Sequence, residues 1–288
     1  MTDKAFVEIT NICNLNCSFC AGHKRRSSYM SPESFKLVLD KLAGKVKYLY
    51  LHLMGEPLTH PQLKEILEIA DGYSFRVMLT TNGTLLDSCA DTLFGCKSLF
   101  KISISVHAFE GNGEDEARLE GYLDKLTGFA VNSAEHGIIT VFRLWNSGGS
   151  DKLNKKIIAR LHEYSTSRGE TPTPNRSGER LCDKTFIEWG EKFDWPDTDA
   201  IASLEADAQT EDRFCYALRD QFGVLVDGTV VPCCLDHDGV LALGNIFKSE
   251  LDDILNSPRA KAIYDGFTRH RALEKYCLTC KRVRPGIR

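Results

Sequence analysis

Three cysteines stand close together near the start of the chain. Cys13, Cys17 and Cys20 lie in the stretch CNLNCSFC, and no further cysteine follows before Cys89. Thiolates at this spacing can bind one compact, soft metal centre. A structural zinc ion or a four-iron cluster usually takes four protein ligands, so three thiolates leave one metal position for a small molecule. A zinc site would need a further ligand such as His23, and three unrelated core cysteines are the third interpretation.

A second group of cysteines lies near the other end of the chain: Cys215, Cys233, Cys277 and Cys280. Four thiolates leave no exchangeable position, so this group predicts a closed site that holds either a second four-iron cluster or zinc. Cys234 could replace Cys233 as a ligand, although the spacing from Gly228 favours Cys233. The remaining three cysteines are predicted to be structural, since cysteine is commonly buried: Cys89, Cys96 and Cys182.

Composition restricts the class of protein. The 288 residues suffice for one large α/β domain with a small addition, and 42% hydrophobic and 26% charged residues are ordinary for a globular protein. A net charge of −4 and a pI near 6.1 disfavour a nucleic acid partner. Neither a membrane span nor a signal peptide is recognisable, which predicts a cytoplasmic location. In that reducing compartment, 11 cysteines are better explained as ligands, catalytic thiols or core residues than as disulfides.

Up to about residue 190 the chain alternates between strand-like and helix-like segments, the pattern of a parallel sheet with crossover helices. Strands are predicted at residues 5–10, 47–54, 75–81, 99–108 and 138–145, with a sixth near 181–188. Helices are predicted between them, at residues 32–44, 60–72, 84–95, 116–137 and 150–165. Ser31 and Pro32 form a helix start, and Thr59 is expected to precede the second helix in the same way.

Several predicted strands are apolar on one face only. In the fourth strand the apolar Ile102, Ile104 and Val106 alternate with polar side chains. A sheet covered by helices on both faces would read as a continuous apolar run. The alternation therefore predicts a curved parallel sheet whose outer face packs on helices and whose inner face lines a cavity.

The character of the chain changes from about residue 208. Residues 221–226 and 229–232 flank Asp227 and Gly228 and predict a β-hairpin, residues 249–267 predict helix, and the last two cysteines follow. We therefore predict two domains, residues 1–195 and residues 196–288.

At this point the sequence resembles a family. The motif C-x3-C-x2-C directly after the first predicted strand is similar to the hallmark of radical S-adenosylmethionine (SAM) enzymes. Phe19 stands where that family has an aromatic side chain beside the adenine. Gly55, Glu56 and Pro57 match its G-E-P stretch, for which the resemblance implies binding of the methionine amino group. Asn82 lies in TTNG, which ends the third strand as in many members.

The resemblance implies two more SAM contacts: Ser105 on the fourth strand for the ribose and Arg143 on the fifth for the methionine carboxylate. It also implies the fold, a partial (β/α)6 TIM-like barrel. The expected cofactors are SAM and a site-differentiated [4Fe–4S] cluster, one electron from which cleaves SAM to a 5′-deoxyadenosyl radical that abstracts hydrogen from the substrate. A cellular reductant such as flavodoxin or ferredoxin is the expected partner.

The C-terminal cysteines resemble those of the twitch domain, a shortened form of the SPASM domain. A full SPASM domain continues with more cysteines, whereas this chain ends KRVRPGIR. The resemblance therefore implies one auxiliary [4Fe–4S] cluster in a small α+β domain, held by Cys215, Cys233, Cys277 and Cys280. A proton acceptor near the substrate is sought among Glu8, His52 and Asp236, with His107, His237 and Asp238 as further candidates.

The predicted substrate is a small sugar- or nucleoside-like metabolite. The barrel begins within about five residues of the N-terminus, which leaves no room for a leader-peptide recognition domain. The short motifs are also similar to those of small twitch proteins, which suggests either a lyase of queuosine-type nucleoside salvage or an alcohol dehydrogenase acting on an aminocyclitol. A peptide-modifying enzyme, of the kind that matures ribosomal peptides or forms sactionine links, is the alternative. A non-catalytic iron–sulfur electron-transfer protein is the alternative from another class.

Overall fold

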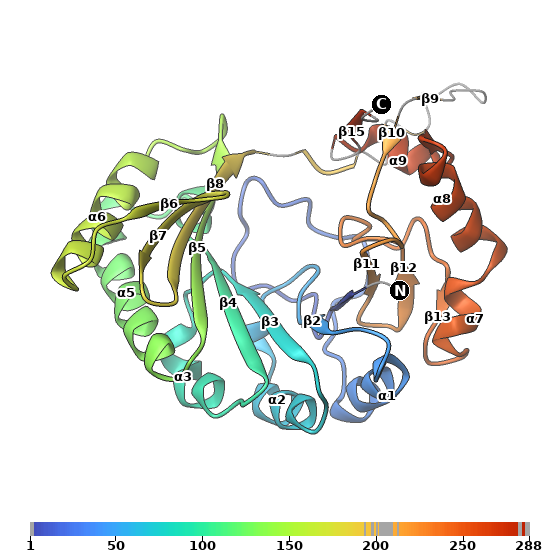
Figure 1. Ribbon diagram of the computed structural model, residues 1–288, viewed down its shortest axis with the longest axis horizontal. Coiled ribbons are helices and arrows are strands. Elements are labelled where there is room, and N and C mark those ends of the chain that lie inside the picture. Colours follow the sequence, from blue (N-terminus) through green and yellow to red (C-terminus); the bar gives the residue numbers. More distant parts are fainter. Residues whose placement is uncertain are drawn as a thin grey trace.

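A computed structural model describes residues 3–192, 194–196, 199, 201, 210–211, 213–281 and 284–285. Six parallel strands form its centre (Figure 1): β1 Lys4–Val7, β2 Tyr48–Tyr50, β3 Arg76–Thr81, β4 Leu99–Ser105, β5 Ile139–Ser147 and β8 Thr185–Glu191. Helices connect them and cover the outer face: α1 Pro32–Leu42, α2 Leu63–Asp71, α3 Leu86–Phe94, α5 Leu119–Glu135 and α6 Asn154–Ser167. Shorter turns of helix are η1 Pro57–Thr59, α4 Ala108–Gly111 and η2 Glu116–Arg118. The predicted α/β class is confirmed.

The sheet is curved and open (Figure 1). Its strand order is β13-β12-β11-β1-β2-β3-β4-β5-β8-β7-β6, so both edges carry strands that do not belong to the alternating βα pattern. One buried apolar cluster fills the space between the strands and the outer helices. Ile102, Ile104 and Val106 are fully buried, as their alternation predicts. The partial TIM-like barrel is therefore confirmed.

Local sequence signals explain how the helices begin. The Ser31 hydroxyl accepts a hydrogen bond from the Ser34 backbone N–H at 3.2 Å, and Pro32 occupies the first helical position of α1. The expected start at Thr59 is wrong, because residues 57–59 form a 3-10 turn and α2 begins at Leu63 without a side-chain cap. In the described part of the chain no helix is long and apolar enough to cross a membrane.

The predicted sixth strand is in fact a hairpin. Strand β7 (Gly178–Cys182) runs antiparallel to β8 (Thr185–Glu191), and the turn between them places Lys184 at φ +52°. Strand β6 (Thr173–Asn175) extends this hairpin within a stretch that reads as a polar loop. The tight turn carries neither Gly nor Asn in the left-handed position, so the sequence offers no usual sign of it.

The C-terminal region continues the same sheet. Strand β11 (Gln221–Val224) lies parallel to β1, with Lys4 opposite Gln221, and forms the predicted hairpin with β12 (Thr229–Val231). The remaining elements are β13 Gly244–Asn245, α7 Leu251–Leu255, α8 Pro258–Thr268 and α9 Lys275–Thr279, with the short strands β9 Thr210–Glu211, β10 Arg213–Phe214, β14 Arg271–Ala272 and β15 Arg284–Pro285. Because one sheet runs through both predicted domains, the division near residue 195 stays a prediction.

Candidate SAM and iron–sulfur sites

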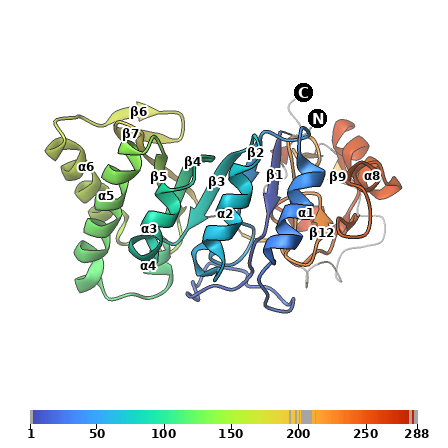
Figure 2. The ribbon, with the colours of Figure 1, turned by 90° about the horizontal axis from the view of Figure 1, so that it is seen from below.

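The three-cysteine loop, residues 11–28, lies at the edge where the parallel strands end (Figure 2). Cys13 and Cys20 are exposed and Cys17 is half-buried. The loop is fixed to α4 and the residue after it, because the Ser18 N–H donates to the Gly111 carbonyl oxygen at 2.7 Å and the Asn16 N–H donates to Asn112 Oδ1 at 3.0 Å. Parallel α/β folds place their functional sites at this edge, where the carboxyl ends of the strands meet.

The thiols of this loop fit a metal centre. Burial, together with the neighbouring Cys13 and Cys20, raises the pKa of Cys17 to about 12, and burial also raises the pKa of Cys13. Three adjoining thiolates therefore need positive charge, which a bound metal supplies while it deprotonates the thiols outright. The alternative zinc ligand His23 is engaged elsewhere, because its ring nitrogens lie 3.0 Å from the Arg25 carbonyl oxygen and 2.9 Å from the Asn11 carbonyl oxygen.

The G-E-P stretch lies directly against the backbone that leads into this loop. Gly55 has φ +75°, and a Cβ on it would lie 2.7 Å from the carbonyl oxygen of Thr10 and 2.8 Å from that of Ile12. Only glycine allows so close an approach of the two backbones. Pro57 begins the 3-10 turn that follows, and the Glu56 N–H donates to the Ile12 carbonyl oxygen at 2.8 Å.

Glu56 is the buried carboxylate of this edge. It accepts hydrogen bonds from the Leu58 N–H at 3.0 Å and from the Asn82 N–H at 2.6 Å. Burial raises the pKa of the Glu56 carboxyl to about 7 in spite of these donors. Asn82 in turn donates from its side chain to Asn14 Oδ1 in the cysteine loop at 2.9 Å. The structure thus brings the G-E-P stretch, TTNG and the three-cysteine loop together.

The other predicted SAM contacts line the same edge. The Phe19 ring packs on Gly111, where a Cβ would lie 2.3 Å from Phe19 Cε1. Ser105 and Arg143 are directly paired across β4 and β5. The Arg143 guanidinium lies over the Trp145 ring, with Cζ 4.4 Å from the ring centroid. Arg143 Nε and His52 Nδ1 are buried and have no hydrogen-bond partner in the described part of the protein, although Arg143 Nε forms an ion pair with Glu188 Oε2 at 3.9 Å.

His52 is a poor candidate for a proton acceptor. Burial and the positive charge of Arg143 and Lys101 lower its pKa to about 3. Thr80 Oγ1 accepts from Arg143 Nη1 at 3.3 Å, so its own proton is available for His52 Nε2 at 3.2 Å.

Glu8 and Asp236 also do not suit the predicted proton transfer. The Glu8 side chain is fully buried in an ion pair with Arg25, at 2.7 Å. Asp236 accepts hydrogen bonds from the N–H groups of Val240 and Leu241, both at 2.8 Å, and so closes the turn formed by residues 236–241. Glu8 also accepts hydrogen bonds from the N–H groups of Met54 and Val226, so both carboxylates support the backbone. Sequence reasoning identified these residue types but could not tell that backbone donors already occupy them.

The other candidate acceptors lie near the same edge. His107 Nδ1 is 2.9 Å from the Arg143 carbonyl oxygen, and its ring lies 4.8 Å from that of Phe19, centroid to centroid. His237 Nε2 lies 3.7 Å from Asp238 Oδ2. The Asp238 carboxylate also accepts from the Lys24 N–H at 2.8 Å, and so joins the C-terminal region to the three-cysteine loop.

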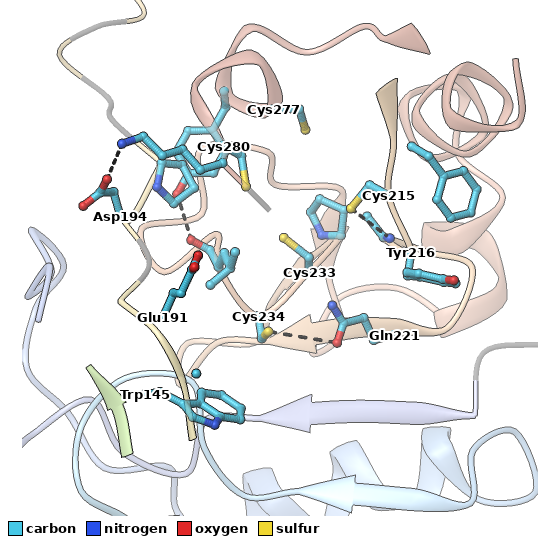
Figure 3. A pocket seen from close by; sticks show the side chains of 18 of the residues that line it. Trp145, Glu191, Asp194, Cys215, Tyr216, Gln221, Cys233, Cys234, Cys277 and Cys280 are labelled. Carbon is cyan, nitrogen blue, oxygen red and sulfur yellow. Dashed lines mark hydrogen bonds and ion pairs between the residues drawn. The ribbon is translucent and has the colours of Figure 1, made fainter. Parts of the chain in front are cut away.

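The four C-terminal cysteines line one cavity (Figure 3). Cys215, Cys233, Cys277 and Cys280 approach it from the loop before β11, the end of the hairpin and α9. Burial raises the pKa of Cys215, Cys233 and Cys277, so these thiols too would ionise only beside a metal. In the described residues no group of three or more His, Cys, Asp or Glu side chains is placed to hold a single metal ion. An iron–sulfur cluster is larger than one ion and separates its thiolates more widely.

The cavity also reaches the barrel. Its volume is about 770 Å³, and its opposite wall includes Trp145 at the end of β5 and Trp189 on β8. Cys234 faces this side, with its sulfur 4.0 Å from Gln221 Oε1 (Figure 3). Neither tryptophan was predicted as a site residue from the sequence, since strand aromatics usually belong to a core. The three cysteines predicted to be structural are buried or half-buried: Cys89, Cys96 and Cys182.

Two family models match the chain. The radical SAM superfamily matches residues 7–165, and the iron-sulfur cluster-binding domain SPASM matches residues 215–281. Together they indicate a SAM-binding [4Fe–4S] site and an auxiliary iron–sulfur site.

Some curated relatives match a short stretch of the chain at higher identity, and others match most of its length at lower identity. The AdoMet-dependent heme synthase of Methanosarcina barkeri is 31% identical over 114 residues, which cover 38% of this chain and 33% of that protein. The sporulation killing factor maturation protein SkfB of Bacillus subtilis is 23% identical over 270 residues, 86% of this chain and 63% of that protein. The subtilosin biosynthesis protein AlbA of Bacillus subtilis is 24% identical and covers 96% of this chain and 66% of its own. The chain thus spans only a third of the first relative and less than two thirds of the second.

Solved structures confirm the fold. The enzyme anSMEcpe with bound AdoMet has a TM-score of 0.60 at 15% identity, covering 98% of this chain and 86% of its own. Streptococcus suis SuiB bound to precursor peptide SuiA has a TM-score of 0.58 at 16% identity, and the match covers 97% of this chain and 70% of SuiB. BtrN in an open conformation has a TM-score of 0.52 at 17% identity, and the match covers 98% of this chain and 93% of BtrN.

Proposed function

Because this chain belongs to the radical SAM superfamily, we propose that it is an enzyme that uses SAM to remove a hydrogen atom from a small polar metabolite. The supporting observation is the cavity shared by the four C-terminal cysteines and the barrel residues Trp145 and Trp189. Its volume of about 770 Å³ includes the space that a cluster on the four cysteines would fill, and the part beside the two tryptophans would take a small molecule. The substrate would thus lie between the SAM-binding edge and the auxiliary site.

Different residues of the chain would bind different parts of the cofactors at the SAM-binding edge. Cys13, Cys17 and Cys20 would hold a four-iron cluster. When bound and reduced, such a cluster supplies the electron that cleaves SAM to methionine and a 5′-deoxyadenosyl radical. The G-E-P stretch, which includes the buried Glu56 carboxylate, would receive the methionine amino group. Arg143, whose buried Nε has no hydrogen-bond partner among the described residues, would receive the methionine carboxylate.

The remaining contacts orient the nucleoside and the substrate. Phe19 would pack beside the adenine, and Ser105 would bond to the ribose. His52 Nδ1 is buried and His52 does not line the cavity, so contact with the substrate falls to the lining residues, Trp145 and Trp189 among them. The C-terminal region closes one side of this space, which restricts water around a reactive radical.

A peptide-modifying enzyme is the second candidate. It is favoured by the similarity to SkfB and AlbA, which extends over 86% and 96% of this chain. Those proteins mature a killing factor and take part in subtilosin biosynthesis. The same SAM-binding edge would serve either substrate, so the two candidates differ only in what enters the cavity.

The test offers both kinds of substrate to one preparation. Anaerobically reconstituted protein is incubated with dithionite, deuterated SAM and either the low-molecular-mass or the peptide fraction of a related cytosol. We expect the low-molecular-mass fraction to stimulate 5′-deoxyadenosine formation, and the mass of its product to separate a lyase from an oxidoreductase. Stimulation by the peptide fraction alone would establish the second candidate, and no 5′-deoxyadenosine with either fraction would refute both.

A cavity variant connects that activity with the structure. Trp189→Ala should reduce substrate-dependent turnover, because Trp189 lines the cavity and is 40% exposed. Leu37→Ala on α1 removes an equally exposed apolar side chain, 39% exposed and outside the cavity lining, and should leave turnover unchanged. Equal effects of the two substitutions would place the substrate elsewhere.

A further inference from the structure

A buried ion pair lies where three parts of the molecule meet. Glu8, directly after β1, accepts hydrogen bonds from Arg25 Nη1 at 2.8 Å and Nη2 at 2.7 Å. The Glu8 side chain is fully buried and that of Arg25 is 12% exposed. Two charges withdrawn from water in this way are stable only if further hydrogen bonds satisfy both of them.

Those further hydrogen bonds reach the G-E-P stretch and the C-terminal region. Glu8 Oε1 accepts from the N–H of Met54, the residue before Gly55, at 3.2 Å. Glu8 Oε2 accepts from the Val226 N–H at 3.0 Å. Arg25 Nε donates to the His237 carbonyl oxygen at 2.7 Å. One ion pair therefore holds the end of the three-cysteine loop, the approach to the G-E-P stretch and two C-terminal segments.

Two neighbouring contacts reinforce this junction. Trp195 Nε1 donates to the carbonyl oxygen of Phe19 in the three-cysteine loop at 3.1 Å. The Trp195 ring also meets the His237 ring edge to face, with centroids 5.1 Å apart. His237 thus contacts both Trp195, which donates to the three-cysteine loop, and Arg25, which lies in that loop.

The same turn begins at the auxiliary site. The Asp236 N–H donates to the carbonyl oxygen of Cys233, at 3.3 Å, and the Asp236 carboxylate closes the turn onto the N–H groups of Val240 and Leu241. A ligand that fixes Cys233 would therefore also fix His237, four residues later. The path from one site to the other consists of a short turn and one ion pair.

We propose that Arg25 and Glu8 are positioning residues that couple SAM binding at the three-cysteine loop to occupation of the four-cysteine site. The proposal rests on the proposed function only in assigning a cluster to each site. An occupied four-cysteine site orders the 235–241 turn, which presents the His237 carbonyl to Arg25 and so keeps the three-cysteine loop against Gly55. Coupling of binding free energies is reciprocal, so bound SAM must also strengthen metal retention at the four-cysteine site.

The test is a double-mutant cycle on the anaerobically reconstituted full chain. Arg25→Lys keeps the charge but cannot bridge Glu8 and His237 together, since lysine lacks the guanidinium fork. Cys277→Ser with Cys280→Ser removes two ligands of the auxiliary site. The SAM dissociation constant is measured by equilibrium dialysis in wild type, in each variant and in their combination.

The expected result is non-additive. Removing the auxiliary ligands should weaken SAM binding about tenfold with Arg25 present and less than about twofold with lysine in its place. The matched control is Arg26→Lys, an exposed neighbour in the same loop, which should leave the tenfold effect intact. Equal weakening in the wild-type and Arg25→Lys backgrounds would overturn the proposal.

A second measurement serves if the cysteine variant does not fold. A chelator is added to the intact protein, and the loss of iron from the auxiliary site is followed with and without SAM. SAM should slow that loss in wild type and in Arg26→Lys but not in Arg25→Lys, and equal slowing in all three would contradict the coupling. Because both readouts are binding events, a failure to form 5′-deoxyadenosine would refute the proposed function and leave the coupling measurable.

Discussion

At the scale of single residues, Gly55 determines whether the G-E-P stretch can reach the three-cysteine loop. A Cβ at this position would lie 2.7 Å from a backbone oxygen that cannot move aside. We expect Gly55→Ala to weaken SAM binding about 100-fold, because small displacements of positioning groups have effects of that order. Equilibrium dialysis of SAM with the reconstituted protein measures this.

Gly44 provides the matched control. It has nearly the same backbone angle, φ +73°, but a Cβ there meets nothing within 4 Å. Gly44→Ala should cost about 1 kcal/mol of stability for the left-handed conformation and leave SAM binding unchanged. If both glycine variants lost SAM equally, backbone strain rather than close approach would be the cause.

Glu56 predicts a pH dependence of SAM binding. Its pKa is raised to about 7 by burial, so below that pH the carboxyl is protonated in the SAM-free protein. The methionine amino group favours the carboxylate, and SAM binding must therefore expel this proton. The SAM affinity should fall by up to about tenfold for each pH unit below 7 and become independent of this group above it.

The variant Glu56→Gln isolates that effect. The amide does not titrate, so its SAM affinity should be weaker but flat between about pH 6 and pH 7, apart from ionisation of SAM itself. Dialysis over this pH range in both proteins gives the two slopes. A common slope would mean that another group is responsible.

At the scale of elements, the three-cysteine loop depends on the short helix α4. Gly111 lets the Phe19 ring lie against the helix, and an alanine there would meet Phe19 Cε1 at 2.3 Å. We expect Gly111→Ala to displace the ring and weaken SAM binding about tenfold, within the 1–3 kcal/mol typical of overpacking. Near-ultraviolet circular dichroism and SAM dialysis would follow the ring and the affinity.

A glycine-to-alanine change on another helix separates this effect from helix propensity. Gly121 lies in α5, where an added Cβ meets nothing within 4 Å. Gly121→Ala should raise stability by about 0.5–1 kcal/mol and leave SAM binding as it is. The prediction for Gly111 fails if its alanine variant also gains stability and keeps SAM.

The elements themselves were predictable to different degrees. Helix α1 begins at the predicted cap, because Ser31 and Pro32 act through local backbone geometry. The β7–β8 hairpin was missed, because its turn has Lys184 in a position where glycine or asparagine would be expected. Local chemistry decides the first case, and pairing with the rest of the sheet decides the second.

At the scale of the whole molecule, the C-terminal region completes the edge of the barrel. Strand β11 pairs with β1 along its whole length, and its Phe222 and Val224 are fully buried. A fragment of residues 1–195 would expose the β1 edge and apolar surface, and would leave Glu8 without its Val226 donor.

We therefore expect residues 1–195 expressed alone to aggregate, while the full chain stays dispersed. Size-exclusion chromatography with light scattering compares the two. A monomeric fragment with native circular dichroism would show that the predicted domain boundary is also a folding boundary. That outcome would also weaken the proposal that Arg25 and Glu8 couple the two regions.

The sequence by itself determined the chemistry that was possible: which thiols occur in threes and fours, which glycine and glutamate follow the second strand, and that the strands form a curved parallel sheet. These signals depend on residue type and short spacing, which the chain carries locally. Only the tertiary structure decided which polar groups are occupied. Glu8 and Asp236 face backbone donors, whereas Arg143 Nε and His52 Nδ1 have no hydrogen-bond partner among the described residues. The reason is physical. A carboxylate that accepts backbone hydrogen bonds and one that is free to take up a proton are the same residue type in the sequence, and only the folded backbone supplies or withholds those donors.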